Sequence, residues 1–334
     1  MNRCAEVPFI LTIDAEPDGH FLDRGRRDRW RGLERMVPEI QALRDRISRA
    51  TGTPATFTWN WRLDPQITET YGTAGWGLER YAELAETLRR EGDELGVHTH
   101  AYRWSRGSEA WIADYGNQEW IETCLRTAVD AYREILGTPP RTSSMGDNWL
   151  NGETVSLLEQ LGIRHELTLQ PRLPVRAFRQ DLGRFTGARV DSSAVAPAPF
   201  QPSEGDVLKA GPRRRDGIWL IPLSVGRCPF GPGTPAGWRR RLPTLLGWRR
   251  TLSQLYLRLG PAQLAGAFED ILTEEARPYF NFGIRSSLAL AQGALGRFRR
   301  SLDFMLGHRQ AKRFNFCTPA RALELLGLGP SPAP

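Results

Sequence analysis

Two histidines stand one residue apart in "ELGVHTHAYRW", residues 94–104. If this segment is a strand, His98 and His100 point to the same side, with Cβ atoms roughly 6.6 Å apart, because successive side chains of a strand alternate between its faces. Two imidazoles at that separation can reach one metal ion. The same spacing recurs in "DAE", where Asp14 and Glu16 would present two carboxylates. Together these side chains are the ligand set of a hydrolytic site for zinc or a similar divalent ion, with a spare acid.

The elements that must position these residues alternate along the chain. Short apolar runs predict strands at 8–14, 55–60, 94–100, 141–146, 163–169, 217–224, 278–285 and 313–318. Amphipathic stretches predict helices at 33–48, 78–92, 120–137, 151–162, 287–306 and 319–327, and two more within 243–275.

This repeated strand–helix order predicts an α/β protein with a parallel sheet, and seven or eight strands favour a closed or nearly closed barrel. We expect one domain over residues 1–327. An irregular segment at about 170–240, rich in Pro, Gly and Arg, would be an insertion, and residues 328–334 a disordered tail.

Such a sheet predicts where the function lies, because ligands of parallel α/β sheets bind beyond the carboxyl ends of the strands. The acids and histidines of the two short motifs would then face one cavity. The polar residues expected at strand ends are Asp14, Glu16, Asn60, Asp64, His98, His100, Asp147, Asn148, His165, Glu166, Arg285 and Ser286.

Three segments carry a family resemblance: "LTIDAEPDG", "ELGVHTHAYRW" and, at 143–167, "SSMGDNWLNGETVSLLEQLGIRHEL". They are similar to the motifs of NodB-like polysaccharide deacetylases, in a divergent branch with an Asp-x-Glu first motif and a His-x-His second motif. The family consists of divalent-metal enzymes that remove N-acetyl or O-acetyl groups from sugars. The resemblance covers residues 8–168 in the correct order, and it implies a distorted (β/α)7–8 barrel of the polysaccharide deacetylase type.

The resemblance implies roles for the residues of the first two motifs. Asp14 matches the aspartate that serves as general base, and Glu16 stands where divergent members place the acidic metal ligand. His98 matches the first histidine ligand. The usual motif has its second histidine where this chain has Tyr102, so His100 would supply that ligand to a divalent metal, with zinc as the expected ion.

The chain departs from the family pattern at two catalytic positions. Ser144 aligns with the arginine that pairs with the base, and the late histidine that acts as general acid has no counterpart near Arg285. Amide hydrolysis needs a donor that protonates the leaving amine. Asp147 and His165 are the candidates for that donor, and Arg285 completes the predicted catalytic set, where it could bind a phosphate or carboxylate of the substrate.

Aromatic residues favour a carbohydrate or amino-sugar substrate. Tryptophan is frequent, with 11 residues, and several fall at or just past predicted strand ends. Aromatic faces stack on the apolar faces of sugar rings, although a core position is the alternative for each tryptophan taken singly. The expected substrate-binding residues are Asn60, Trp61, Asp64, Tyr102, Trp104, Asn148 and Trp149.

Composition argues against other partners and compartments. The net charge is +7, but the basic residues are almost all arginines interleaved with acids, which indicates a solvated surface rather than a nucleic-acid footprint. No run approaches eighteen apolar residues, so we expect neither an export signal nor a membrane span. Scattered cysteines without framework spacing indicate reduced thiols and a cytoplasmic protein. They are Cys4, Cys124, Cys228 and Cys317.

Four functions from different classes remain open. The leading one is a metal-dependent deacetylase of an amino sugar or glycan precursor. Ser144 and the absent late histidine also fit a catalytically degenerate sugar-binding relative on the same barrel. An arginine-rich nucleic-acid binder is a third possibility. A glycoside hydrolase with Asp14 and Asp147 as its carboxylate pair is a minor fourth.

Overall fold

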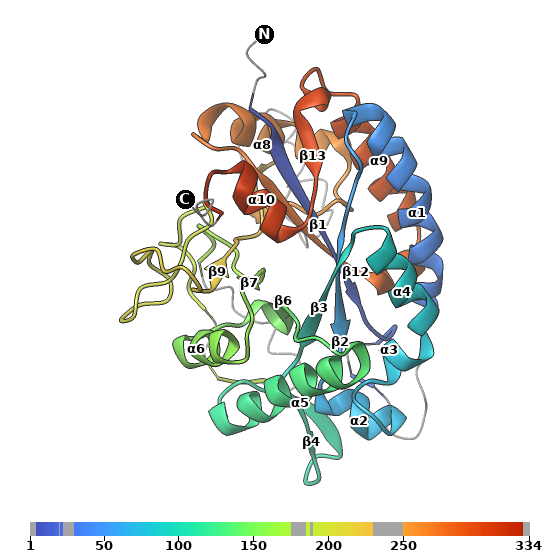
Figure 1. Cartoon of the computed structure of the whole chain (residues 1–334), viewed down its shortest axis with the longest axis vertical. Helices are drawn as coiled ribbons and strands as arrows, with labels where there is room; N and C mark the ends of the chain where they lie inside the picture. The colour runs from blue at the N-terminus through green and yellow to red at the C-terminus, as the bar shows by residue number, and fades with distance from the viewer. Residues whose placement is uncertain are drawn as a thin grey trace, which may run out of the picture.

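The first apolar run forms the strand around which the sheet is built. In the computed structural model, which describes residues 5–19, 21–22, 30–174, 185–187, 190–229 and 250–329, β1 (Val7–Ala15) is buried almost throughout. This burial is typical of a parallel strand that is covered on both faces. β1 pairs in parallel with β2 (Thr58–Arg62), β12 (Phe280–Arg285) and β13 (Phe314–Phe316) (Figure 1).

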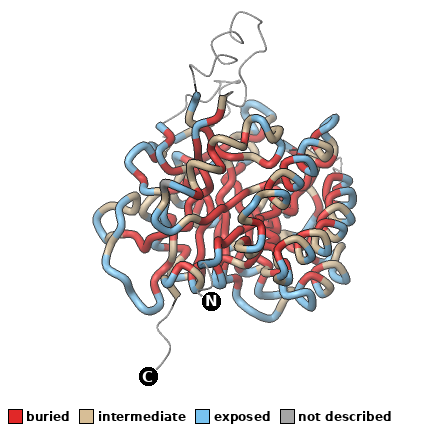
Figure 2. Tube along the Cα trace, turned by 90° about the horizontal axis from the view of Figure 1, so that it is seen from above, coloured by how far each residue is buried: buried red, intermediate tan, exposed pale blue. Residues whose placement is uncertain are grey.

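The described residues form an eight-stranded sheet in the order β12-β1-β2-β3-β6-β7-β9, with β13 attached to β1. This confirms the α/β class and the expected number of strands. The sheet lies at the buried centre of the molecule, and exposed residues ring it (Figure 2). The other strands of the path are β3 (Glu94–Thr99), β6 (Thr142–Met145), β7 (His165–Glu166) and β9 (Trp219–Leu220).

The sheet curls into a distorted barrel in which no strand ladder of the described residues joins its two end strands, β9 and β12. The segment after β9 crosses the gap instead. Ser224 N–H donates to Asn281 O (2.9 Å), and Asn281 N–H donates to Ser224 Oγ (2.9 Å). A loop, rather than a strand ladder, therefore links β9 to β12 and closes the barrel, and in this sense the barrel is distorted. Outside it lie two small sheets, formed by β4 (Tyr102–Ser105), β5 (Ala110–Asp114) and β8 (Phe185–Thr186), and by β10 (Val225–Cys228) and β11 (Thr251–Gln254).

Helices cover the outside of the barrel (Figure 1). α1 (Arg31–Thr51) is amphipathic and buries Met36, Ile40, Leu43 and Ile47, which recur at helical spacing. The other helices are α2 (Pro65–Tyr71), α3 (Trp76–Arg80), α4 (Ala82–Arg90), α5 (Gln118–Leu136), α6 (Gly152–Gln160), α8 (Pro261–Glu274), α9 (Ala294–Leu306) and α10 (Pro319–Leu325). In the described part of the chain, none of the helices is long and apolar enough to cross a membrane.

Three helical expectations were wrong in detail. The stretch 78–92 is split at Tyr81 into α3 and α4. The helix expected from residue 287 begins only at Ala294, because Gly293 takes a left-handed φ of 67° after a 3-10 turn. Of the two helices expected within 243–275, the described residues 250–275 contain α8, but before it they form β11, which pairs with β10; this long-range pairing overrides local propensity.

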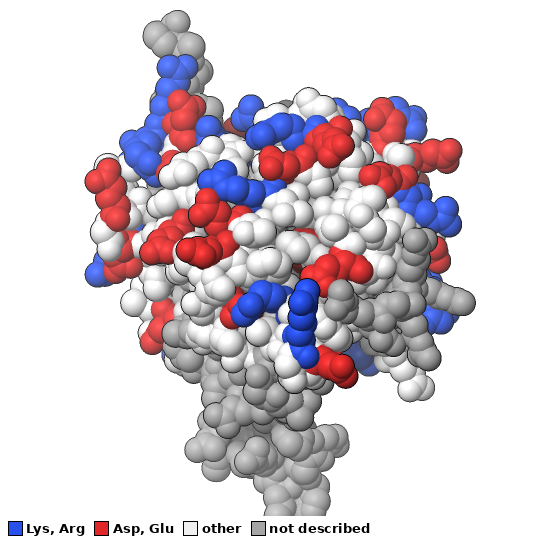
Figure 3. Space-filling model, turned by 90° about the horizontal axis from the view of Figure 1, so that it is seen from below, with Lys and Arg blue, Asp and Glu red and all other residues white. Residues whose placement is uncertain are grey.

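Other expectations fall partly on residues outside the described ranges. These are the insertion at 175–184, 188–189 and 230–240, residues 243–249 of the stretch expected to hold two helices, the tail at 330–334, and Cys4. The remaining cysteines, Cys124, Cys228 and Cys317, are buried and free. On the face shown in Figure 3, basic and acidic residues are interspersed.

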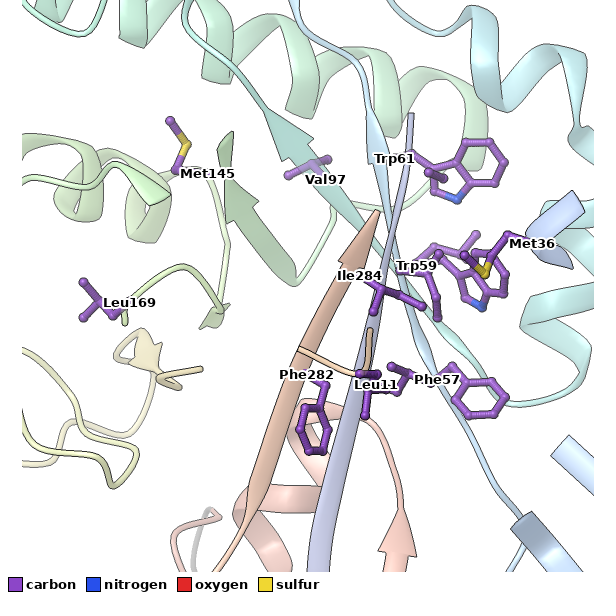
Figure 4. Packing of buried hydrophobic residues seen from close by; sticks show 14 of the residues in the cluster. Leu11, Met36, Phe57, Trp59, Trp61, Val97, Met145, Leu169, Phe282 and Ile284 are labelled. Atoms are coloured by element: carbon purple, nitrogen blue, oxygen red, sulfur yellow. The ribbon is translucent and has the colours of Figure 1, made fainter. Parts of the chain in front are cut away.

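Strand alternation decides which residues of β2 face the barrel interior. Asn60 points inward, where its amide donates to Ser144 Oγ (3.0 Å). Trp59 and Trp61 therefore point outward into the helix layer (Figure 4), and the Trp61 ring lies 6.4 Å from that of Trp30. This corrects the expectation that Trp61 binds substrate, because its indole is completely buried in the core.

Glu166 in β7 generates a prediction about stability and pH. Its carboxylate accepts hydrogen bonds from Thr168 N–H (2.9 Å) and from Thr168 Oγ1, and burial raises its pKa to about 7. Because the folded state holds the proton more tightly than the unfolded state, this contribution is full below about pH 4.5 and is lost as the pH rises through 7.

The loss amounts to about 3 kcal/mol, since each pKa unit corresponds to about 1.4 kcal/mol. We expect Glu166→Gln to remove it, so that the variant has the higher free energy of unfolding at pH 8 and the difference shrinks at pH 5. Urea denaturation at the two pH values measures this. An identical pH dependence in both proteins would contradict the prediction.

Candidate metal centre

Glu16, His98 and His100 meet at the carboxyl ends of β1 and β3. Each offers a ligand atom, and these atoms lie within 4.8 Å of one another. The Nε2 atoms of the two histidines face each other at 3.0 Å, as the spacing of one residue predicts, and His100 Nε2 lies 3.9 Å from Glu16 Oε2. None of the three residues exposes more than 5% of its surface. Two imidazoles and one carboxylate are a donor set that zinc accepts.

The second nitrogen of the His98 ring is held by Ser144. Ser144 Oγ lies 2.9 Å from His98 Nδ1 and donates its single proton to Asp14 Oδ1 (3.3 Å). The hydroxyl also accepts from the Asn60 amide. With its proton directed to Asp14, Ser144 can only accept from His98. A His98 ring that donates from Nδ1 to this hydroxyl can present a lone pair of Nε2 to His100.

Asp147 imposes the same tautomer on His100. Asp147 Oδ2 lies 3.3 Å from His100 Nδ1 and accepts from the Tyr115 hydroxyl (3.0 Å). A carboxylate at one ring nitrogen favours the proton there and leaves the other nitrogen free to bind a cation. Burial lowers the pKa of His100, and the nearby Arg62 lowers it further, so the ring stays neutral. When both rings carry their proton on Nδ1, two lone pairs face each other at 3.0 Å, and a cation between them would stabilise the pair.

The loop after β6 fits tightly under the His100 ring. A Cβ atom at Gly146 would lie only 2.2 Å from His100 Nδ1, so this close approach requires glycine. Asp147 and Asn148 follow with left-handed φ angles of 55° and 52°. Such angles cost about 1–3 kcal/mol for a residue with a side chain and cluster at functional sites. Here they direct the Asp147 carboxylate to His100.

Sequence reasoning missed Arg62, a fully buried cation under the site. Its Nε donates to Asp64 Oδ2 (2.9 Å), and its Nη1 lies 3.7 Å from Glu16 Oε2. The alternation of β2 could have indicated it, because Asn60 and Arg62 share the inward side of this strand. Asp64 accepts from His100 N–H (3.0 Å) and caps α2 through Gln66 N–H. It is completely buried, which corrects the expectation that Asp64 binds substrate.

Charges around the two acids of the first motif act in opposite directions. Burial alone would raise the pKa of Glu16, but Arg285, the two histidines and Arg62 together hold it well below its usual range, so Glu16 stays ionised. Burial raises the pKa of Asp14, and the negative charge of Glu16 adds to that rise. Asp14 is thus the stronger base of the pair.

A cavity of about 230 Å³ opens above the histidines. Its volume lies below the usual range for drug-sized ligands and suits one small group. Of the expected site residues, it is lined by Asp14, His98, His100, Asp147, Asn148 and Arg285. Asn60 lies below them and reaches the site through Ser144.

Three aromatics that the sequence predicts to bind substrate do not line this cavity, and their role stays a prediction. Tyr102 is buried, with its ring 4.5 Å from that of His100. Trp104 packs against Trp111 in the β4–β5 hairpin. Trp149 stacks on Tyr115 and borders a separate groove of about 1160 Å³ along α6.

His165 lies away from the cavity and cannot act as the proton donor there. It pairs with Thr142 Oγ1 (3.1 Å) and lies 3.6 Å from Glu94 Oε1. Thr142 and Glu94 begin β6 and β3, so His165 is at the amino ends of the strands, whereas the metal ligands lie at the carboxyl ends. Of the strand predicted at 163–169, only His165 and Glu166 form β7, and its pairing register places His165 at the amino ends of the strands.

Comparisons with known proteins agree on the fold. No protein-family model and no curated protein sequence matches the chain significantly. Among solved structures, the chain is similar to Puue allantoinase, with a TM-score of 0.54, 12% identity, and coverage of 96% of this chain and 90% of that one. It is also similar to a provisionally assigned glycoside hydrolase/deacetylase from Parabacteroides distasonis, with a TM-score of 0.52, 13% identity, and coverage of 96% and 71%.

A provisionally assigned polysaccharide deacetylase from Mycobacterium smegmatis matches with a TM-score of 0.47, 14% identity, and coverage of 98% of this chain and 92% of that one. The two likenesses with the higher TM-scores confirm the expected fold, a distorted α/β barrel of the deacetylase type. At this low identity they show the fold alone.

The close approach of Gly146 to His100 generates a prediction. We expect Gly146→Ala to displace the imidazole and to cost about 1–3 kcal/mol of stability, because an added methyl group overpacks the site. Urea denaturation measures this. Gly107→Ala is the matched control, since a Cβ there meets nothing within 4 Å, and it should change stability by less than about 0.5 kcal/mol. Equal effects of the two substitutions would contradict the predicted clash.

Proposed function

We propose that this protein is a metal-dependent hydrolase that removes an N-acetyl or other acyl group from an amino sugar or glycan precursor. The observation that carries the proposal is the pair of Nε2 atoms 3.0 Å apart beside the ionised Glu16. A divalent ion bound there, for which zinc is the first candidate, supplies Lewis-acid chemistry that polarises the acyl carbonyl and activates water.

The charge of the surroundings favours a dication. Four buried or half-buried carboxylates and two guanidinium groups surround the histidine pair, which leaves two formal negative charges when all are ionised. Unbalanced charge in a buried site is costly, and a divalent cation would neutralise it. These groups are Asp14, Glu16, Asp64, Asp147, Arg62 and Arg285.

Asp14 is the general base in this proposal. It lines the cavity, exposes part of its carboxylate, and has a raised pKa, which makes it a better proton acceptor. Ser144 stands where the resemblance leads one to expect an arginine. Its neutral hydroxyl orients Asp14 without lowering the basicity of Asp14 as strongly as a guanidinium group would.

Asp147 is the proposed donor to the leaving amine; because it is a carboxylate while it holds His100, it must first take up the proton that Asp14 removes from the attacking water. It lines the cavity, and it flanks the histidine pair at His100, whereas Asp14 flanks the pair at His98. The Tyr115 hydroxyl supports its position. With His165 at the other end of the strands, Asp147 is the remaining candidate of the two that the sequence offered.

A sugar-binding protein without catalysis is the second candidate function. One observation favours it: Arg285 Nε donates to Glu16 Oε1, so a cation of the chain already pairs with the proposed metal ligand. Turnover separates the two functions, since only the hydrolase releases acetate.

The metal and the base can be tested together. We expect the purified protein to bind about one zinc ion, and His98→Ala and His100→Ala to lose it, because each substitution removes one facing nitrogen. Asp14→Asn should keep the metal but lose about 10²–10⁴ in rate, which is typical for a missing general base. Metal analysis and acetate release from a panel of chito-oligosaccharides and acetamido sugars measure these effects.

His308→Ala is the matched control, because His308 pairs with Glu269 on α8 and lies outside the cavity. It should bind metal as the wild type does. The proposed centre would be refuted by a wild type that binds no divalent ion, or by a His98→Ala variant that binds it equally well.

A further inference from the structure

Glu16 is held from two sides at the end of β1. Ser286 fixes its backbone, since Glu16 N–H donates to Ser286 Oγ (3.2 Å) and the same hydroxyl donates to Glu16 O (3.0 Å). Arg285, the last residue of β12, holds the side chain through the bond from Nε to Oε1. Arg285 at the end of β12 thus supplies a cation for the carboxylate, and Ser286, the next residue, holds the backbone.

The second carboxylate oxygen of Glu16 faces the histidine pair. Oε2 is buried and accepts no hydrogen bond from the described residues, and Nη1 of Arg62, which lies 3.7 Å away, donates none to them. His100 Nε2 lies 3.9 Å from the same oxygen. A buried carboxylate oxygen without a donor is costly, so Oε2 is ready to accept a ligand at this point.

We propose that Arg285 is a built-in competitor of the metal ion: its guanidinium group holds Glu16 in the metal-free protein, and an entering dication must displace it or share the carboxylate with it. This inference rests on the proposed metal centre and adds a residue that sets its affinity. An ion that binds weakly to nitrogen and oxygen ligands would not overcome this competition, so Arg285 also makes the site selective.

Arg285, and not Arg62, is the movable cation. Arg62 is completely buried and anchored by Asp64 and by Gln66. The side chain of Arg285 is 32% exposed and lines the cavity, so its guanidinium group has a direction in which to move when the ion enters.

The competition has two measurable consequences. Removing the charge of Arg285 should raise metal affinity, because the ion no longer competes for Oε1 and no longer meets that positive charge. It should also destabilise the metal-free protein, because a buried carboxylate loses its partner. The rise in Tm on metal addition should therefore be larger in the variant, since ligand binding stabilises only the folded state that carries the site.

The experiment uses Arg285→Gln, with zinc and cobalt as the probes. We expect calorimetry to show at least tenfold tighter metal binding than in the wild type, and scanning calorimetry to show a lower Tm without metal and a larger rise with it. Arg44→Gln is the matched control, because it breaks a different buried arginine–carboxylate pair, that of Arg44 with Asp93 at the amino end of β3. It should lower Tm and leave metal affinity unchanged.

Each outcome decides the matter. Binding in the variant that is equal to or weaker than that of the wild type overturns the role of Arg285 and leaves the metal centre standing. Absence of binding in both proteins overturns the centre as well. Binding in the variant alone refutes the native metal centre, because the wild type then binds no divalent ion. If Arg285→Gln does not fold, Arg285→Met, which keeps a long uncharged side chain, is held to the same tenfold criterion.

Discussion

The proposed site depends on two imidazole rings inside the barrel, those of His98 and His100, whose Nε2 atoms lie 3.0 Å apart. Their outer nitrogens are held by Ser144 and Asp147, and these contacts favour the ring protons there, with a lone pair on each inner nitrogen. Such an arrangement is unfavourable unless a cation lies between the rings. Gly146 allows the loop to pass under one ring, and a left-handed turn directs Asp147 to it. The tight contact at Gly146 and the unfavourable backbone angles of Asp147 and Asn148 thus hold the His100 ring in place.

Buried charge is the second constraint, and it explains why the acids of the first motif differ. Glu16 lies among cations and stays ionised, whereas Asp14, held by a neutral hydroxyl, is the better base. The proposed metal ligand, Glu16, and the proposed base, Asp14, therefore differ in how tightly they hold a proton, although they are only two residues apart. This division of roles is what metal-assisted hydrolysis requires, and pairs of groups with separated pKa values are typical of catalytic sites.

Much of the fold and half of the site could be predicted, because both rest on periodicity. Alternation along a strand places His98 beside His100, and the repeated strand–helix order gives the sheet. The same alternation shows that Trp61 is outward once Asn60 is inward, but the sequence does not reveal which parity faces the barrel. The pairing register that places His165 at the amino ends of the strands depends on residues far apart in the chain. The contact between Glu16 and Arg285 depends on them too. Neither leaves a local signal.

Anomalous diffraction at the zinc absorption edge, from crystals grown with zinc, tests the central claim most directly. The account predicts one strong peak at about 2.0–2.1 Å from Nε2 of both His98 and His100, with a Glu16 oxygen completing the protein ligands. It is contradicted by crystals in which the two rings turn away from each other, or in which zinc binds only elsewhere on the protein.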